Sequence, residues 1–387
     1  MKSAEGRRYQ ASLGLAYACS ASSNAALRLL KRHPAEAVWK AGQKELEALG
    51  MQSIPAQRFL LAKRTYAPIE VIDRVSALLQ YGGLDFVPCG TPGYPPELLN
   101  LSHPPAGLFI KGDRARLQDL LRSARVTIVG TRRATAYGTR AAREVAGAFA
   151  SRGIAVVSGM ALGIDGRAHE AALDAGGLTV AVLGCGVDVV YPSRHRSLYG
   201  RIAEAGLVIA ELPPGTEPAP WTFPNRNRLL AALGDGVLVV EGSLTSGAMQ
   251  TADQAAHLGR AVFAVPGAIY WEGHRGCNLL IRDGATPVLD PGATVEEFLL
   301  QTRIERGERQ PPEQTGGGGD GRQDPFRELA AAGGEMILEA MDERSCSIDA
   351  LVLRTGTPAR RITAALAELE LAGLVTRAGP GLYIRAP

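Results

Sequence analysis

The sequence has no apolar run of the roughly 20 residues that a membrane-spanning helix needs. Its first ten residues, MKSAEGRRYQ, contain no apolar stretch followed by a small-residue cleavage site, so they lack the pattern of a secretory signal. The chain also has little excess of one charge, since the formal net charge is +3 over 387 residues. A balance this small neither requires nor excludes a nucleic-acid partner, because a binding patch can be local. We therefore expect a soluble, cytoplasmic protein without a membrane span.

Closely spaced cysteines and the common nucleotide motifs are also missing. The five cysteines lie far apart, so no CxxC pair is present to hold zinc or form a redox couple. No GxxxxGK[ST] string occurs, and the loop after Val129 is not GxGxxG, because Arg132 and Arg133 stand where a dinucleotide fold needs small residues. The sequence therefore predicts no bound metal, no nicotinamide or ATP cofactor, and buried, reduced thiols.

Changes in composition along the chain predict four regions. Residues 1–85 are expected to form a small helical domain of the SAM or helix–hairpin–helix kind, because apolar positions such as Leu46 and Phe59 are separated by glycine and proline breaks. Residues 86–300 are predicted to form an extended Rossmann-like domain, whose first part, 86–112, looks like an irregular connector rich in proline and glycine. The polar segment 301–325 is predicted to be a flexible linker, and 326–387 a winged-helix-like domain.

Short β-branched runs alternate with alanine-rich segments from Val126 onward. This alternation is typical of βαβ units and predicts an α/β fold with a Rossmann-like parallel sheet. The expected strands are 126–129, 154–157, 179–183, 207–210, 237–240, 261–265 and 287–290, and the expected helices are 138–150, 164–175, 198–205, 226–233 and 247–258. In the tail, helices are expected near 335–341, near 347–354 and from Thr357 onward, followed by the hairpin strands LVTRAG and GLYIR.

Polar and glycine-rich loops follow the expected strands, at the ends where open parallel sheets bind their ligands. Glycine lets the backbone approach a ligand, while amides and guanidinium groups attract an anion. Five such loops, at 129–133, 158–165, 184–194, 223–228 and 246–247, are expected to converge on one edge of the sheet as a phosphate site. The candidate residues are Gly130, Thr131, Arg132, Arg133, Ser158, Gly159, Gly163, Arg194, Arg226, Asn227, Arg228, Ser246 and Gly247.

Each of these features also has a structural interpretation. A single glycine-rich turn commonly serves close packing only. Asp165 has the chemistry of a general base, but its place at a helix start favours capping of that helix. His169 is expected to be a packed, hydrogen-bonded histidine, because no second histidine or cysteine lies at metal-binding spacing. The arginines of Arg226-Asn227-Arg228 suit surface ion pairs and phosphodiester contacts equally well. Tyr137, Tyr191, Trp221 and Phe223 are candidates for base stacking or for the core.

The motifs GTRRATAYG, SGMALGIDGRAHEAAL, VLGCGVDVVYP, FPNRNRLLAAL and SGAMQTADQAAHLGRAVFAVPG, in this order, resemble the DNA-processing protein A family, also called DprA or Smf. The resemblance spans most of the chain. It implies a non-enzymatic protein of natural transformation that binds incoming single-stranded DNA, protects it and helps load the RecA recombinase. It also implies a homodimer, and single-strand-binding protein is a further candidate partner.

The resemblance carries over to particular positions. It implies a DNA-phosphate site formed by Gly130, Thr131 and Arg132, the SGMALGID loop, Arg194 and the arginines of the RNR segment. The aspartate, histidine and glycines of GIDGRAH would be mainly structural. The sequence departs from the family at His195, where asparagine is usual, so a DNA contact by that side chain is in doubt.

Two other functions remain as alternatives. A nucleotide-processing Rossmann-like hydrolase would carry PGGxGTxxE, and the nearest string here, residues 214–218, lacks the glycine pair and has its glutamate two places early. A sequence-specific regulator would act through the winged-helix-like tail and prefer duplex DNA. That tail is equally suited to protein contacts, because its expected third helix carries both arginines and glutamates.

Overall fold

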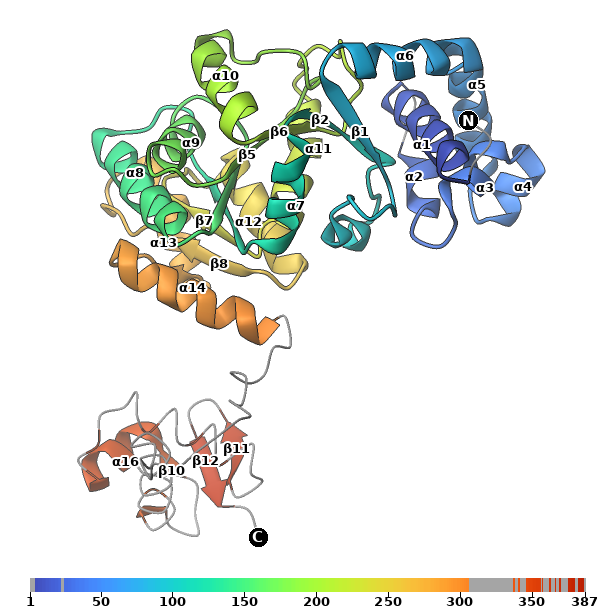
Figure 1. Ribbon diagram of the computed structural model, residues 1–387. Coiled ribbons are helices and arrows are strands. Elements are labelled where there is room, and N and C mark those ends of the chain that lie inside the picture. Colours follow the sequence, from blue (N-terminus) through green and yellow to red (C-terminus); the bar gives the residue numbers. More distant parts are fainter. Residues whose placement is uncertain are drawn as a thin grey trace, which may run out of the picture. The chain divides into compact units, whose positions relative to one another are not determined.

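The computed structural model describes residues 4–21, 24–305, 337, 340, 341, 346–355, 357, 362, 366, 369, 375–379 and 382–385. The chain divides into two compact units, Met1–Pro311 and Pro312–Pro387. The first unit holds a set of N-terminal helices and a large sheet with helices on both faces (Figure 1).

The N-terminal segment is helical, as its sequence predicts. Its core is built on α1, whose Leu13 and Leu15 are fully buried and which packs against α3 and α5. Gly14 lets the Trp39 ring approach, because a Cβ atom there would lie 2.6 Å from that ring. The helices are α1 (Ala4–Ser20), α2 (Ala25–Leu29), α3 (Ala35–Lys40), α4 (Gln43–Ala48), α5 (Ser53–Tyr66) and α6 (Ile69–Tyr81).

Across residues 24–305, nine strands form one sheet in the order β1-β2-β6-β5-β4-β3-β7-β8-β9. The neighbours from β6 through to β9 pair in parallel, and this part confirms the predicted Rossmann-like α/β core. These strands are β3 (Arg125–Val129), β4 (Ala155–Ser158), β5 (Thr179–Leu183), β6 (Leu207–Ala210), β7 (Gly236–Val239), β8 (Ala261–Ala264) and β9 (Thr286–Pro287).

The connector at 86–112 is more regular than its sequence suggests. Its ends form β1 (Leu84–Pro88) and β2 (Gly107–Gly112), which pair antiparallel and extend the sheet beyond β6. Phe86 and Phe109 pack with ring centroids 4.8 Å apart, and a Cβ atom on Gly107 would lie 2.3 Å from the Phe86 ring. The expectation of an irregular connector is therefore wrong at both ends, because two short apolar runs find partners outside their own neighbourhood. Between them lies the short helix η1 (Pro96–Asn100).

Helices cover the sheet on both faces, and alternate residues of the strands point to opposite faces. In β7 and the residue after it, Val237 and Val239 belong to one apolar core, while Leu238 and Val240 belong to the other. The second core includes residues of α8, α9 and α14, and the first includes residues of α11 and α12 (Figure 1). The helices are α7 (Arg114–Arg122), α8 (Ala136–Ser151), α9 (Ile164–Asp174), α10 (Arg196–Ala205), α11 (Thr222–Leu233), α12 (Gly247–His257), α13 (Arg275–Arg282) and α14 (Pro291–Glu305).

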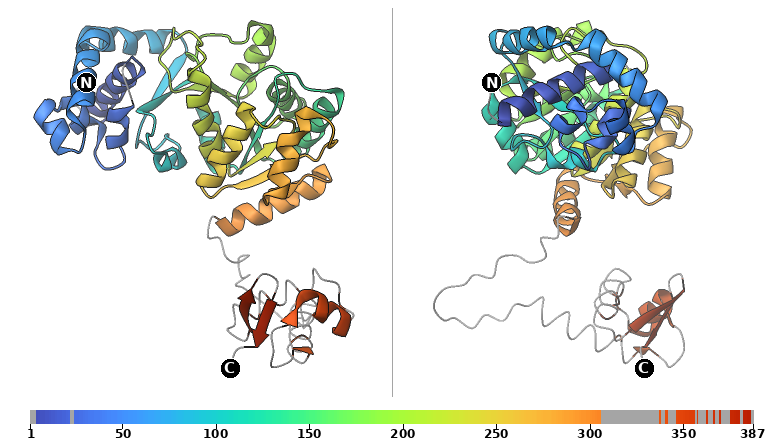
Figure 2. Two further views of the ribbon diagram at one scale, coloured as in Figure 1. Left: turned by 180° about the vertical axis from the view of Figure 1, so that it is seen from behind. Right: turned by 90° about the vertical axis from the view of Figure 1, so that its right-hand side faces the viewer.

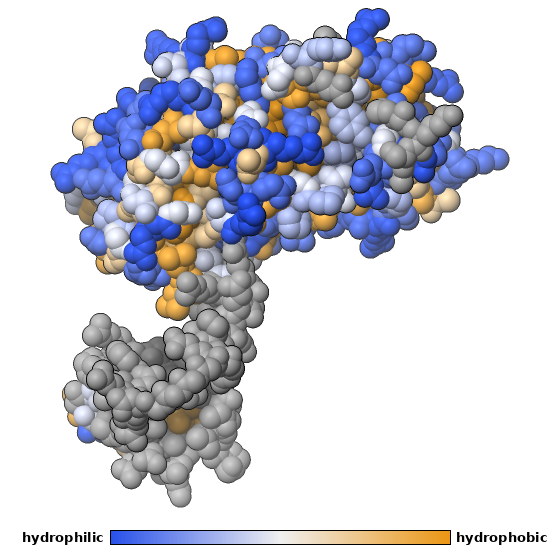
Figure 3. Space-filling model, in the orientation of Figure 1, coloured by the Kyte–Doolittle hydropathy of each residue, from blue (hydrophilic) through white to orange (hydrophobic). Residues whose placement is uncertain are grey.

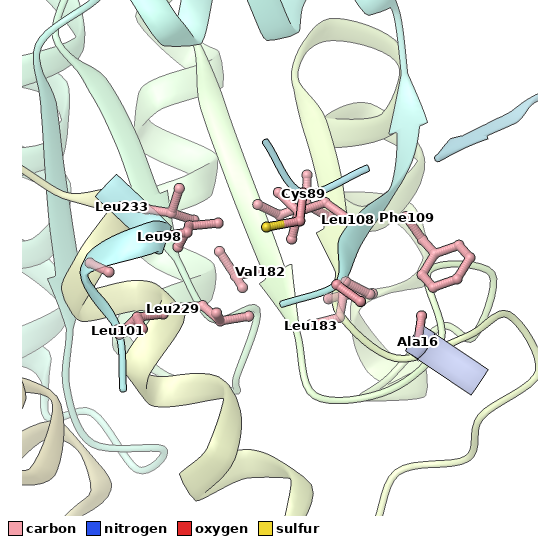
Figure 4. Packing of buried hydrophobic residues seen from close by; sticks show 14 of the residues in the cluster. Ala16, Cys89, Leu98, Leu101, Leu108, Phe109, Val182, Leu183, Leu229 and Leu233 are labelled. Carbon is pink, nitrogen blue, oxygen red and sulfur yellow. The ribbon is translucent and has the colours of Figure 1, made fainter. Parts of the chain in front are cut away.

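The N-terminal helices pack on the β1 end of the sheet. α1 and α6 both contact β1, and the left-hand view of Figure 2 shows these helices beside that edge from behind. Figure 4 shows the shared core, where Leu98 and Leu101 of the η1 region lie near Leu229 and Leu233 of α11. One apolar core therefore continues from the predicted helical domain into the sheet. Hydrophilic residues cover much of the coloured surface in Figure 3, with apolar patches between them.

The second unit confirms the predicted hairpin. β11 (Val375–Gly379) and β12 (Leu382–Arg385) pair antiparallel, and β10 (Cys346–Ser347) adds a third strand in the order β10-β12-β11. The helix predicted near 347–354 is α16 (Ile348–Thr355). Most of the helices predicted at 335–341 and from Thr357 onward lies outside the described residues. The predicted linker is wrong at 301–305, which belong to α14, and 306–325 lie outside the described residues.

Candidate nucleic-acid interface

The strand order places a crevice beside β3. The chain runs outward from β3 through β4 and β5 to β6 and then returns to β7 on the other side of β3. Open α/β sheets bind ligands at such a reversal, at the carboxyl ends of the strands. A groove of about 620 Å³ lies there, and residues from all five predicted loops line it, namely Gly130, Ala161, Tyr191, Phe223 and Ser246. The predicted convergence of these loops on one edge is confirmed.

The loop after β3 is held by its backbone. The amide of Thr131 donates to the Glu241 carbonyl oxygen at 2.7 Å, and the Thr131 carbonyl accepts from the Ile164 amide at 3.2 Å. Gly130 is required for this approach, because a Cβ atom there would lie 2.5 Å from the Ile164 side chain. Gly130 and Thr131 thus fix the path of the loop, and the next residue, Arg132, leaves it on the groove side.

Glu241, which is not among the predicted site residues, anchors the same loop. This residue follows β7 and is 1% exposed. Its Oε2 accepts from the Thr135 amide at 3.0 Å and from the Thr135 hydroxyl at 3.2 Å. A Cβ atom on Gly138 would lie 2.1 Å from that oxygen, so glycine is needed in the first turn of α8. The available signal is an acidic residue directly after a fully apolar strand, because a buried carboxylate needs partners.

Arg132 and Arg133 are exposed, and neither forms an ion pair in the part of the chain that the structure describes. The Arg132 guanidinium carbon lies 5.2 Å from the centroid of the Phe223 ring, a cation–π contact. Phe223 in turn packs against Tyr191, with ring centroids 5.5 Å apart. The groove therefore presents a cationic fork beside two aromatic rings.

The loop after β4 carries mainly structural residues. The Ser158 hydroxyl is fully buried and donates to the Ile128 carbonyl at 2.6 Å. Gly163 has φ of 80°, and a Cβ atom there would lie 2.3 Å from the Thr131 carbonyl oxygen. Gly163 is also the N-cap of α9, so the capping interpretation of Asp165 is wrong. Asp165 instead accepts from the amides of Gly159 and Ala161, at 3.1 and 3.3 Å.

Two buried titratable groups support this loop from α9. Burial raises the pKa of Asp165, and the charge of Arg226 and the two loop amides oppose that rise. His169 is fully buried, and its Nδ1 lies 2.7 Å from the Thr179 hydroxyl. Burial lowers the pKa of His169 to about 3, so the ring is neutral at physiological pH. The expectation of a packed, hydrogen-bonded histidine is confirmed.

Arg226 points inward, although its residue lines the groove. The side chain is 6% exposed, and Nη1 donates to the Gly159 carbonyl at 2.6 Å and to the Val182 carbonyl. Gly159 has no side chain in the way, since a Cβ atom would lie 2.6 Å from the guanidinium nitrogens. Burial lowers the pKa of Arg226, and the carboxylate of Asp165 opposes this effect. Arg226 therefore joins the loop after β4 and the strand β5 to α11.

Arg228 and Asn227 are also engaged with the protein itself. Arg228 is 6% exposed and forms an ion pair with Glu211, whose Oε2 lies 2.5 Å from Nη2. The Asn227 amide donates to the Gly247 carbonyl at 3.4 Å and so joins α11 to α12. The RNR segment was expected at a helix start, but α11 begins earlier, at Thr222, because Pro224 is tolerated in the first turn.

Three further candidates remain, and of these Ser246 lines the groove. Arg194 lies in the short helix η2 (Ser193–His195), is exposed and forms no ion pair with any described residue. His195 is half-buried, and its Nδ1 lies 3.1 Å from the Met160 carbonyl oxygen. Ser246 is the N-cap of α12, which begins at Gly247, and its hydroxyl has no hydrogen-bond partner among the described residues. The first backbone amides of α12 therefore lie beside the groove, at a helix N-terminus that no described side chain caps.

The arrangement can bind an anion next to planar rings. Exposed guanidinium groups and a helix N-terminus supply positive potential, while Phe223 and Tyr191 supply apolar faces. The residues described contain no group of three histidine, cysteine, aspartate or glutamate side chains placed to hold a metal ion. Among those same residues, no helix combines the length and apolar character needed to cross a membrane. All five cysteines are described, and each is buried and unpaired.

Comparison with known sequences identifies the same two regions as the fold. The family model for DNA recombination-mediator protein A matches residues 85–299, and the model for the DprA winged helix domain matches residues 327–381. Protein Smf from Escherichia coli (strain K12) is 36% identical over 360 residues, which cover 90% of this chain and 89% of that protein.

Two solved structures are similar as well. The X-ray structure of DNA processing protein A from Streptococcus pneumoniae has a TM-score of 0.65 and 29% identity, and covers 77% of this chain and 99% of that one. DNA processing protein A from Helicobacter pylori, whose structure is described with its single-stranded DNA binding mode, has a TM-score of 0.51 and 29% identity, covering 56% and 96%. The chain belongs to the DNA recombination-mediator protein A family, whose members are also named DprA and Smf.

Proposed function

We propose that this protein binds single-stranded DNA across the carboxyl edge of its sheet and acts in natural transformation. It would work in the cytoplasm, where it receives incoming single strands, protects them and helps load the RecA recombinase. The observation that carries the proposal is the exposed Arg132 stacked beside Phe223 and Tyr191 in the groove. The similarity to the Helicobacter pylori protein, with its described single-stranded DNA binding mode, supports the same ligand.

The chemistry of the groove suits a strand without a fixed sequence. Such strands are held by phosphate contacts together with base stacking on aromatic side chains. Arg132, Arg133 and Arg194 are exposed cations for the phosphates, and the first backbone amides of α12, from Gly247 onward, add helix-terminal donors. Stacking comes from Phe223 and Tyr191, whose rings lie 5.5 Å apart.

The remaining candidate residues would act by shaping the site. We assign Arg226, Asn227 and Arg228 a positioning role, because their side chains already donate hydrogen bonds to protein carbonyls and to Glu211. Gly130, Thr131, Ser158, Gly159 and Gly163 would allow the backbone to adopt its path around the groove. This division separates residues that contact DNA from residues that hold them.

The test is a titration of labelled single-stranded and duplex DNA at several salt concentrations. We expect the single strand to bind more tightly, with little sequence preference, and affinity to fall with salt at a log–log slope of roughly −0.7 per phosphate contacted. The slope should be shallow, because few basic residues converge on the groove. Equal affinity for duplex and single strand at moderate salt would contradict the proposal and favour a duplex-reading regulator.

The proposed partners need separate measurements. We propose a homodimer that places two α/β domains on one strand, engages RecA and acts on DNA coated with single-strand-binding protein. Light scattering over a range of concentrations tests the dimer. RecA assembly on coated strands, with and without this protein, tests the loading activity, and an unchanged assembly rate would argue against it.

We also propose that the protein has no catalytic activity of its own. The string at 214–218 that most resembles a phosphoribohydrolase motif holds Gly215, whose amide donates to Asp188 Oδ1 at 2.8 Å, and the exposed Glu217. Incubation with nucleoside monophosphates, followed by chromatography for free base, decides between binding and hydrolysis. Release of base beyond one equivalent would establish the hydrolase alternative.

A further inference from the structure

The loop after β8 exposes three consecutive large apolar side chains. Ile269 is 72% exposed, Tyr270 96% and Trp271 53%. Single exposed apolar residues are common on protein surfaces, but neighbouring ones that include two aromatic rings mark interaction sites. Nothing in the groove described above uses these side chains.

The loop is structured, so this exposure is a fixed property of the surface. The Gly267 amide donates to the Asn278 Oδ1 at 3.1 Å, and the Asn278 amide group returns a bond to the Gly267 carbonyl at 3.0 Å. The Ala268 amide donates to His274 Nδ1 at 2.9 Å, and the Trp271 amide closes a turn on the Ala268 carbonyl at 3.1 Å. The chain is thus tied down on both sides of Ile269 and Tyr270.

The same loop is bonded to the elements that carry Arg132. β8 pairs in parallel with β7, which pairs with β3, so the loops after all three strands lie at one edge of the sheet. Tyr137, in the first turn of α8, donates from its hydroxyl to the Pro266 carbonyl at 2.8 Å, and its ring centroid lies 5.5 Å from that of His274. The Gly242 amide, next to Glu241, donates to the Gly273 carbonyl at 2.7 Å.

The loop after β3 and the first turn of α8 therefore contact two different neighbours, the groove and the loop after β8. Arg132 reaches Phe223 in the groove, and the helix that follows the loop reaches the 266–274 segment through Tyr137. Arg133, exposed and without an ion pair to any described residue, lies between these two contacts in the sequence. A strand that leaves the groove past Arg133 would pass toward Tyr270 and Trp271.

We infer that Tyr270 and Trp271 form a second stacking site for bases of the same single strand, outside the groove. The occupant follows from continuity with the proposed phosphate contacts and from the flat aromatic faces, since stacking on such rings accepts every base. The inference rests on the proposed function, because it extends that strand by a second contact. It predicts that these residues matter only for strands long enough to reach them.

The test compares thymidine oligonucleotides of increasing length on the full chain. The double variant Tyr270→Ala/Trp271→Ala should bind the shortest oligonucleotides as the parent does and lose about fivefold or more in affinity for the longer ones, the loss expected for one or two stacked bases. Tyr81→Ala is the matched control, because this side chain is 90% exposed on α6, in the N-terminal helices. Melting curves confirm that each variant folds.

Tryptophan fluorescence gives an independent reading. Long oligonucleotides should quench the parent more than Trp271→Phe, and short ones should quench both equally. Unchanged affinity of the double variant at every length would overturn the inference, while loss of binding in Arg132→Ala would still support the proposed function. A parent that binds no single strand would overturn both. A double variant that loses self-association but keeps its DNA affinity would make the loop a protein contact and overturn the inference alone.

Discussion

Two sets of arginines around one groove differ in burial, and the difference separates two roles. Arg132 and Arg133 are exposed, and neither pairs with an acidic residue in the part of the chain that is described. Arg226 and Arg228 are each 6% exposed, and their guanidinium groups donate hydrogen bonds to oxygen atoms of the protein. Side chains that face solvent remain available to a ligand, whereas buried ones are available only to the fold.

The two sets still depend on each other. Burial is the main cause of the lowered pKa of Arg226; the carboxylate of Asp165 opposes it, and repulsion from Arg132 adds to it. Arg226 holds the loop after β4, whose residue Gly163 abuts the Thr131 carbonyl of the Arg132 loop. The buried set therefore builds the surface on which the exposed set acts, and the following predictions test that division.

The largest effect is expected for Arg226→Ala. This change leaves the Gly159 and Val182 carbonyls without a donor and removes the positive charge beside buried Asp165. Loss of such a buried charged donor should lower the free energy of unfolding by about 3–5 kcal/mol. Urea unfolding followed by circular dichroism measures the change, and a stable variant with weakened DNA binding would instead place Arg226 among the ligand contacts.

A smaller effect, on binding alone, is expected for Arg132→Ala. A guanidinium can hold a phosphate by two parallel hydrogen bonds, so its loss should weaken single-strand binding by about 1–3 kcal/mol. The salt slope should fall by roughly one phosphate contact. The melting temperature should not change, because the side chain is exposed.

Arg133→Ala is the matched control for Arg132, since it removes the same charge one residue further along. It should weaken short-strand binding less, because it lacks the contact of Arg132 with the Phe223 ring. If the folded Arg132→Ala protein bound as tightly as the parent, the phosphate site would have to move to Arg194.

The strands and helices of the α/β core could be predicted from sequence because their signals are local. The apolar runs at 126–129, 179–183 and 207–210 fall within or match β3, β5 and β6. The strand β2 was missed because its partners, β1 and β6, lie far from it in sequence and proline and glycine dominate the segment between β1 and β2. Long-range pairing of this kind leaves no periodic trace.

The candidate site could be predicted as a place but not as a set of contacts. The loops meet as expected, yet the sequence of Arg226-Asn227-Arg228 does not show that the side chains point into the protein. Their direction depends on carbonyls of β5 and the loop after β4, and on Glu211, all distant in sequence. Glu241 was missed for the same reason, because its partner Thr135 lies 106 residues away.

Stability should depend on pH through His169, which is fully buried beside the Thr179 hydroxyl. Burial lowers the pKa of His169 to about 3, whereas the unfolded chain has an ordinary histidine pKa near 6.5. Below pH 6.5 the unfolded state binds the proton and the folded state does not, so the unfolding free energy should fall by up to about 1.4 kcal/mol per pH unit down to about pH 3. The same series on His169→Gln should lack this component, and parallel profiles for the two proteins would contradict the assignment.

The smallest effect is expected at His195, the position at which the sequence resemblance implies asparagine. The ring is half-buried, its Nδ1 lies 3.1 Å from the Met160 carbonyl, and it packs over Gly166, where a Cβ atom would lie 2.6 Å from the ring. This side chain therefore resembles the buried arginines more than Arg132, since its polar atom already has a protein partner. An asparagine amide can donate to the same carbonyl, so His195→Asn should change single-strand affinity by no more than about 0.5 kcal/mol. Titration of both proteins with the same oligonucleotide checks this, and a tenfold loss would mean that the other ring edge contacts DNA.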